Sequence, residues 1–406
     1  MYSVAQSKSE WRKYWYLPLV AAIGYSSAGL HIYGLGAFVG PLGSEFKWNR
    51  VETFAGSALV SLVVALLSLP IGAMVDVIGP RRVAMTGVVA VSGAIALLST
   101  ATGSTANWMM LWALVALCAT MVQAPIWTTA VVSRFDASRG LAIGITLCGG
   151  SIPIFALPLL ATILIEAVGW RQAFIGLGAL WGVILFPIVA LFFRGARDDQ
   201  GRRAPAEAAV AQTDGVSLGT ALRTPTLHKL MFAAGFFALA ILGLVVHFVP
   251  MLTDAGMTPL MAAAAASLIG IFSIVGRLCT GIVLDRFSPY VIGAVSFLLP
   301  ILGCAIVLIE LGGTARFFVA AILFGLSLGA ETDVIPYLAS RQFGLRNFGA
   351  IQGALHSAIA IGSASGPLTA GLIFDRFGSY TPFLVATSIA MLASAVLIFT
   401  LRPRRN

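Results

Sequence analysis

Apolar residues fill the chain in runs of about 20, and short polar segments separate the runs. A helix of about 20 apolar residues is long enough to cross the hydrocarbon core of a bilayer, which is roughly 30 Å thick. The pattern predicts twelve membrane-spanning helices, over residues 15–40, 53–75, 83–103, 108–132, 140–164, 171–193, 228–252, 262–284, 290–310, 315–339, 348–373 and 381–401. Charged residues make up only 10% of the chain, against about 25% in soluble domains. The sequence therefore predicts an all-α membrane protein.

The two halves of the chain repeat each other at a constant offset of 209 residues. In one turn, Gly72, Asp76 and Pro80 return as Gly281, Asp285 and Pro289. A second block keeps the offset, because Gly140, Pro158, Gly169 and Phe174 return as Gly349, Pro367, Gly378 and Phe383. Because turn and packing residues in both blocks recur at the same offset, the sequence indicates a duplicated unit of six helices. We predict two six-helix bundles, over 1–193 and 228–406, joined by a cytoplasmic linker at 194–227.

Lysine and arginine residues are distributed unevenly between the two predicted membrane faces. With the amino terminus inside, 19 of the 25 lie on the cytoplasmic side, five lie outside, and Arg277 lies within a helix. This bias predicts that both termini are cytoplasmic. Topology accounts for the formal net charge of +9, so we expect no nucleic-acid partner. We expect a multi-pass protein of a bacterial cytoplasmic (inner) membrane, whose amino-terminal residues lack a cleavage pattern.

Several kinds of chemistry find no support in the sequence. No G-x-x-x-x-G-K-[ST] motif occurs, which argues against a built-in ATP motor. The cysteines lie in apolar runs at spacings that indicate neither a metal site nor disulfides, and they are Cys118, Cys148, Cys279 and Cys304. We expect no metal, no cofactor and no enzymatic activity, because spacing alone assembles no set of nucleophile, base and oxyanion donors.

The repeated turn resembles the loop motif of the major facilitator superfamily, in which G-x-x-x-D precedes basic residues. The resemblance implies the major facilitator fold, with twelve helices in two pseudo-repeats, and secondary transport by alternating access. It also implies a cytoplasmic gate or latch between the halves, formed by Gly72, Asp76, Arg81, Arg82, Gly281, Asp285 and Arg286. The alternative is that these charges only fix the topology. Val291 replaces Arg82 at the repeat offset, so the second copy of the motif differs.

Ionisable side chains inside membrane helices are costly and usually functional. Arg277 lies in the predicted helix 262–284, roughly 12 Å from its cytoplasmic end, and its counterpart in the first half is Ser68. Because arginine stays protonated and its planar guanidinium matches a carboxylate, we expect Arg277 to bind a substrate carboxylate. The alternative is a permanent ion pair with Glu331 or Asp333, which lie at a similar depth. These two carboxylates are the candidates for proton coupling.

The sequence around Arg277 is similar to the eighth helix of monocarboxylate transporters and oxalate/formate antiporters. Both families carry R-x-x-x-G-x-x-x-D, which Arg277, Gly281 and Asp285 match. The resemblance implies that Arg277 binds the carboxylate of an organic acid. The chain departs from these families, since Ser273 stands where animal monocarboxylate transporters have Asp. The helix 1 lysine of those transporters is missing, and so is the helix 11 lysine of the oxalate/formate antiporters. A single fixed cation is easier to reconcile with one carboxylate than with two.

Further polar and aromatic residues are candidates to line a substrate cavity. We expect substrate contacts from His31, Tyr33, Gln123, Trp127, Tyr337 and His356. His31, His247 and His356 all suit a proton relay, because histidine titrates near neutral pH. His247 is also a candidate for an external gate or an interfacial position. Instead of contacting substrate, the aromatic residues could anchor the protein at the membrane interface. The histidines could instead form hydrogen bonds to a neighbouring backbone or hydroxyl group.

The leading hypothesis is secondary active transport of a small organic monocarboxylate by alternating access, coupled to protons by symport. Arg277 anchors the carboxylate, and one or more of Glu331, Asp333, His31 and His356 couple protonation to the movement of the two halves. The alternative is efflux of drugs or hydrophobic metabolites through the same fold, although Arg277 disfavours cationic drugs. A third hypothesis is a sensor that binds a ligand and signals to a partner, for which the sequence offers no appended cytoplasmic domain.

Overall fold

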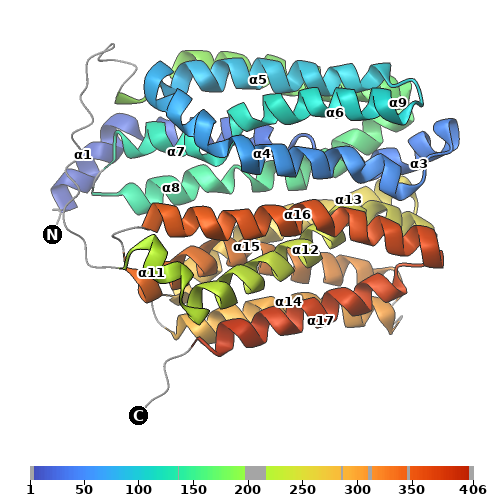
Figure 1. Ribbon diagram of the computed structural model, residues 1–406. Coiled ribbons are helices and arrows are strands. Elements are labelled where there is room, and N and C mark those ends of the chain that lie inside the picture. The colour runs from blue at the N-terminus through green and yellow to red at the C-terminus, as the bar shows by residue number, and fades with distance from the viewer. Residues whose placement is uncertain are drawn as a thin grey trace. The chain divides into compact units, whose positions relative to one another are not determined.

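The computed structural model describes residues 4–135, 137–196, 216–284, 287–309, 313–344 and 348–401, which form α-helices and short 3₁₀-helices (Figure 1). The chain divides into two compact units. Unit 1 consists of Met1–Phe46 and Leu66–Glu207, and unit 2 of Lys47–Ala65 and Ala208–Asn406. Helix α4 (Arg50–Ile78) therefore contributes its first half to unit 2 and its second half to unit 1. Residues 197–215 of the predicted linker at 194–227 lie outside the described residues.

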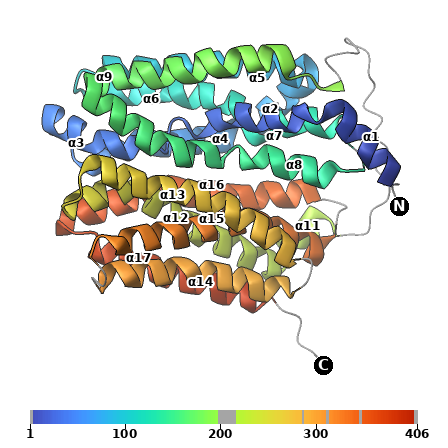
Figure 2. The same ribbon diagram turned by 180° about the vertical axis from the view of Figure 1, so that it is seen from behind.

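Unit 1 contains nine helices among the described residues, counting the second half of α4. The others are α1 (Val4–Tyr14), α2 (Tyr16–Tyr25), α3 (Leu35–Phe46), α5 (Pro80–Leu97), α6 (Thr105–Ala119), α7 (Ala124–Val132), α8 (Arg139–Cys148) and α9 (Ser151–Phe192). Helix α5 packs along α9, as both views show (Figures 1 and 2). The contact is close because Gly178 has no side chain, and a Cβ added there would lie 2.4 Å from the carbonyl oxygen of Ser92.

The predicted span 15–40 is not one helix. Helix α2 ends at Tyr25, a 3₁₀-helix follows at Ser26–Gly29, and α3 begins only at Leu35. The hydroxyls of Ser26 and Ser27 bond to the carbonyl oxygens three residues earlier, both at 2.6 Å. Such local side-chain bonds compete with the helical backbone pattern. The prediction of a continuous helix was wrong here because it counted apolar length and ignored these bonds.

Other predicted spans of unit 1 are also interrupted. Residues 108–132 divide into α6 and α7, separated by a 3₁₀-helix at Thr120–Val122 and by the extended backbone of Gln123. Helix α8 ends at Cys148, and α9 runs on from Ser151 to Phe192. Within α9, Gly169 has φ 81° and ψ 163°, which no helix adopts, so two helical segments meet there. The break corresponds to the predicted gap between spans 140–164 and 171–193.

Unit 2 is built mainly of long helices. In addition to the first half of α4, it contains α11 (Leu218–Leu222), α12 (Pro225–Asp254), α13 (Pro259–Leu284), α14 (Pro289–Leu308), α15 (Ala315–Phe343), α16 (Phe348–Phe377) and α17 (Thr381–Phe399). Helices α12, α13 and α14 begin with proline, whose missing N–H is not needed in a first turn. Helix α13 packs along α15, α12 along α16, and α14 along both α15 and α17 (Figures 1 and 2).

Ten segments of the described chain are long and apolar enough to cross a membrane, judged by length and composition. One of them, Leu141–Phe192, contains the break at Gly169, and its 52 residues are far longer than the roughly 20 that one crossing needs. Large apolar side chains such as Leu66 and Val183 are 76% and 73% exposed, as expected for lipid-facing positions. The count of twelve spans and the cytoplasmic position of both termini stay predictions.

Candidate functional site

The contact between α13 and α15 in unit 2 positions Arg277. A Cβ added at Gly276 would lie 2.3 Å from the carbonyl oxygen of Leu326, and one added at Gly329 would lie 2.0 Å from that of Ser273. The same added atom at Gly329 would lie 2.7 Å from the backbone nitrogen of Arg277. Glycine on both helices therefore lets the two backbones touch at the level of Arg277.

The Arg277 side chain is half-buried, and part of its guanidinium has no hydrogen-bond partner. Its Nε and Nη1 atoms are both inaccessible to solvent, and no acceptor among the described residues reaches them. Leaving a buried donor unsatisfied costs about 1–3 kcal/mol, and more when the group is charged. Arg277 is therefore a cation with unused donors inside a helix that is apolar along most of its length.

Two carboxylates on α15 lie near this cation. Glu331 and Asp333 follow Gly329 by two and four residues; Glu331 is 7% exposed and Asp333 is half-buried. Both carboxylates experience the charge of Arg277, and Glu331 also experiences that of Asp333. Among the described residues, neither forms an ion pair with Arg277 within 4.0 Å. The three groups form a cluster in which Arg277 is not locked to a protein acid.

The remaining unit 2 candidates lie on α15 and α16. Tyr337 is half-buried and follows Pro336, which lacks the N–H that would otherwise bond to the carbonyl of Thr332. His356 is exposed, and it lies one turn after Gln352 on the same face of α16. The Oε1 atom of Gln352 is buried without a hydrogen-bond partner in the described structure.

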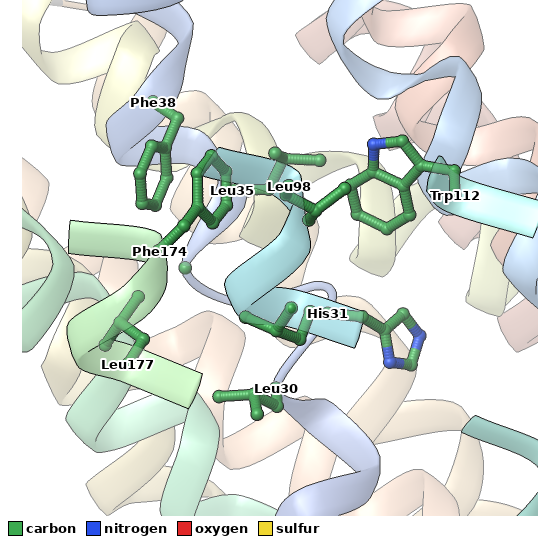
Figure 3. A pocket seen from close by; sticks show the side chains of 10 residues that line it. Leu30, His31, Leu35, Phe38, Leu98, Trp112, Phe174 and Leu177 are labelled. Carbon is green, nitrogen blue, oxygen red and sulfur yellow. The ribbon is translucent and has the colours of Figure 1, made fainter. Parts of the chain in front are cut away.

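In unit 1, His31 and Tyr33 lie in the non-helical turn before α3. His31 is 7% exposed, and its Nδ1 has no hydrogen-bond partner among the described residues. It lines a small pocket, in which its ring and that of Trp112 lie on one side, and the stacked rings of Phe38 and Phe174 on the other (Figure 3). Tyr33 is half-buried. Sequence reasoning placed His31 inside a helix, whereas the break in the span gives it this position.

Gln123 and Trp127 are held by local hydrogen bonds. The side-chain amide of Gln123 donates to the carbonyl oxygen of Ala119 at 2.9 Å. The Trp127 indole is completely buried, donates to the carbonyl oxygen of Val122 at 2.8 Å, and packs against the ring of Phe193. These contacts stabilise the α6–α7 break, so both side chains have a structural role in this conformation.

The cytoplasmic gate motif is described only in part. Asp285 and Arg286 lie outside the described residues, and so does the side chain of Asp76. Gly72 lies on α4 and Gly281 on α13. Arg81 donates from Nη2 to the carbonyl oxygen of Ala190 on α9, and Arg82 is exposed. The latch therefore stays a prediction.

A second polar cluster, which sequence reasoning missed, surrounds Arg50 in unit 2. The Arg50 side chain forms an ion pair with Asp254 at 2.5 Å and donates to the hydroxyl of Tyr380. Its guanidinium lies 3.6 Å from the ring centre of Phe374. The Asp375 carboxylate accepts hydrogen bonds from the backbone nitrogens of Arg50 and Val51 at 3.3 and 3.2 Å, at the start of α4. A carboxylate is favourable there because a helix amino terminus carries positive partial charge.

His247 extends this cluster into the core of unit 2. Its Nδ1 lies 2.8 Å from the Tyr380 hydroxyl, and its Nε2 lies 2.9 Å from the carbonyl oxygen of Pro367. Since that carbonyl can only accept, Nε2 carries a proton and donates to it, and in a neutral ring Nδ1 then accepts from the Tyr380 hydroxyl. Burial raises the pKa of Tyr380 and the Arg50 charge opposes this rise, so the hydroxyl keeps its proton at neutral pH. The predicted gate residue is thus fully hydrogen-bonded in this conformation.

Comparisons with known proteins agree on the family and the fold. A family model described as Major Facilitator Superfamily matches residues 21–355. The chain is 26% identical to monocarboxylate transporter 13 of Rattus norvegicus, over 84% of this chain and 78% of the relative. It is 23% identical to monocarboxylate transporter 12-B of Danio rerio, over 88% and 81% of the two chains. The identity is also 23% to the uncharacterized MFS-type transporter YhjX of Escherichia coli K12, over 87% of each.

A solved structure shares the fold at low sequence identity. It is the crystal structure of a bacterial homolog to the human lysosomal transporter Spinster, in an inward-facing and unoccupied conformation. The TM-score is 0.68 at 16% identity, and the match covers 95% of this chain and 94% of that one. At this identity the likeness concerns the fold alone.

Proposed function

The chain belongs to the major facilitator superfamily, and on this premise we propose that it is a secondary active transporter of a small organic monocarboxylate. Transport proceeds by alternating access across the cytoplasmic membrane of a bacterium. Members of this family are membrane transporters that carry small molecules. The ten long apolar segments of the described chain agree with a protein that crosses the bilayer several times. Two of the similar proteins named above are monocarboxylate transporters, which favours an organic acid as the cargo.

The observation that carries the proposal is the unsatisfied guanidinium of Arg277. Its buried Nε and Nη1 lack acceptors among the described residues, and a substrate carboxylate supplies acceptors of matching charge. Hydrogen bonds to charged groups contribute about 1.5–3 kcal/mol each, so the binding of an anion is favoured at this position. A cationic drug would be repelled by the Arg277 charge and could not accept hydrogen bonds there with an anionic group. The proposal therefore prefers carboxylate transport to the efflux of such drugs.

We propose that Glu331 and Asp333 carry the coupling proton. Both carboxylates experience the Arg277 charge without being paired to it among the described residues. When a substrate anion occupies Arg277, the stabilising effect of that cation on the neighbouring carboxylates weakens, and protonation becomes more favourable. Binding of the anion and binding of a proton then support each other, which is the requirement for symport.

The test is uptake into vesicles that contain the purified chain. Arg277→Gln removes the charge at similar length, and we expect it to abolish the uptake of labelled lactate, acetate and benzoate, of which the parent protein transports at least one. Arg341→Gln removes an exposed arginine at the end of α15 and serves as the control for charge loss. Size-exclusion profiles and unfolding midpoints establish that each variant is folded. Normal carboxylate uptake by folded Arg277→Gln would overturn the proposal.

A further inference from the structure

Helix α1 has a packed face and an exposed side. One face packs onto unit 1, and it consists of Ser7, Glu10, Trp11 and Tyr14, which follow the i, i+3, i+4, i+7 spacing of one helix side. The exposed side comprises Lys8, Ser9, Arg12, Lys13 and, directly after α1, Trp15. Within it, Lys8, Arg12 and Trp15 share one face at the i, i+4, i+7 spacing. The chain continues from Trp15 into α2 at Tyr16.

The packed face is held by specific contacts to Phe135, Ala137 and Ser138, which lie between α7 and α8. The two carboxylate oxygens of Glu10 accept hydrogen bonds from the backbone nitrogens of Ala137 and Ser138, at 2.9 and 3.1 Å. The Trp11 ring lies 5.1 Å from that of Phe135, measured between centroids. These contacts fix α1 across the end of unit 1 where α7 ends and α8 begins (Figures 1 and 2). The rotation of α1 about its axis is thereby determined, and so is the direction of its other face.

The exposed face has a composition that suits a charged membrane surface. Lys8 and Arg12 are four residues apart, so their like charges repel on an isolated helix. Trp15 is 57% exposed at the point where the chain turns from α1 into the first apolar run. Tryptophan at such a junction is typical of the headgroup level of a bilayer. An anionic surface would relieve the repulsion and accommodate the indole at the same time.

We propose that the Lys8–Arg12–Trp15 face of α1 binds the headgroups of anionic phospholipids. The face is an independent site, and its existence does not depend on the transported substrate. Each basic residue near an anionic bilayer strengthens binding roughly fivefold, and the effect is screened by salt. Lipid binding on one side and the contacts of Glu10 and Trp11 on the other then fasten α1 between the bilayer and unit 1.

The test is hydrogen–deuterium exchange of the full chain in two kinds of nanodisc. One contains only phosphatidylcholine, and the other contains equal parts of phosphatidylcholine and phosphatidylglycerol. We expect the amides of 4–14 to exchange more slowly with phosphatidylglycerol present, and this difference to diminish at high salt. The variant K8Q/R12Q loses the difference, because roughly 30-fold weaker headgroup binding is expected. The variant K8R/R12K, which keeps both charges, retains it.

Other outcomes would overturn the proposal. Equal exchange of α1 in the two kinds of nanodisc, or an undiminished difference in K8Q/R12Q, would show that the exposed face does not bind anionic lipid. Inorganic phosphate added to phosphatidylcholine nanodiscs tests whether a soluble phosphate group suffices. If inorganic phosphate alone slows the exchange of the α1 amides, the exposed face binds a soluble anion and not the membrane. Faster exchange of α1 in both lipids is expected only for variants of the packed face, such as Glu10→Gln.

Discussion

The close contact of α13 and α15 yields a prediction for Gly329→Ala. The added Cβ would lie 2.0 Å from the carbonyl oxygen of Ser273 and 2.7 Å from the backbone nitrogen of Arg277. Both partners are backbone atoms, so no side chain can rotate away, and the two helices must separate by roughly 1 Å to restore ordinary contact. Overpacking of this kind costs about 1–3 kcal/mol, and the better helix propensity of alanine offsets at most about 1 kcal/mol of it.

The separation also displaces the backbone of Arg277, and with it the guanidinium that we propose binds the substrate, so the variant is expected to weaken carboxylate binding as well as stability. The assay measures the unfolding midpoint and the affinity for a bound carboxylate in the same detergent. Gly353→Ala on α16 is the matched control, because a Cβ added there meets nothing within 4 Å. We expect Gly329→Ala to unfold earlier and to bind more weakly, and Gly353→Ala to be unchanged or slightly more stable. Parent-like stability and affinity of Gly329→Ala would refute the packing argument.

Three further predictions concern other parts of the molecule. Arg50→Gln removes the ion pair with Asp254, and because the two side chains are 11% and 40% exposed we expect a loss of about 1–2 kcal/mol in unfolding free energy, which denaturant titration measures. Trp127→Ala should cost about 3–5 kcal/mol in the same titration, while Trp127→Phe should cost about 1 kcal/mol for the lost hydrogen bond to Val122. Glu331→Gln should reduce the acceleration of uptake that we expect of the parent on external acidification, because one of the two proposed proton carriers is removed; an unchanged pH response would exclude Glu331 as a proton carrier.

The sequence predicted the long helices of unit 2 well. Their starts coincide with Pro225, Pro259 and Pro289, since proline fits a first helical turn and ends the preceding segment. The prediction of a continuous helix failed where side-chain hydrogen bonds interrupt the helical backbone within an apolar run. The hydroxyls of Ser26 and Ser27 bond to backbone carbonyls in the middle of the first predicted span, and hydropathy carries no information on such bonds.

The candidate site was predicted in its residue types, and the structure added what spacing cannot provide. An arginine inside an apolar helix stands out in any sequence, and so do two carboxylates in the segment 315–339. Spacing along the chain shows neither the close approach of α13 to α15 nor that Arg277 forms no ion pair among the described residues. The Arg50 cluster escaped notice because its partners, Asp254 and Tyr380, lie 204 and 330 residues further along the chain. Residues so far apart in the sequence come together only in the folded chain.

The most direct test of the account is the binding of matched ligands that differ only in charge. Lactate and lactamide have the same size, and affinities of both for the parent protein and for Arg277→Gln form a double-mutant cycle. If Arg277 binds the carboxylate, the cycle gives a coupling of about 1.5–3 kcal/mol, or roughly 10- to 150-fold in affinity, as expected of a charge-assisted hydrogen bond. If the parent protein binds lactate no better than lactamide, or if the preference persists in Arg277→Gln, the carboxylate is held elsewhere or not at all.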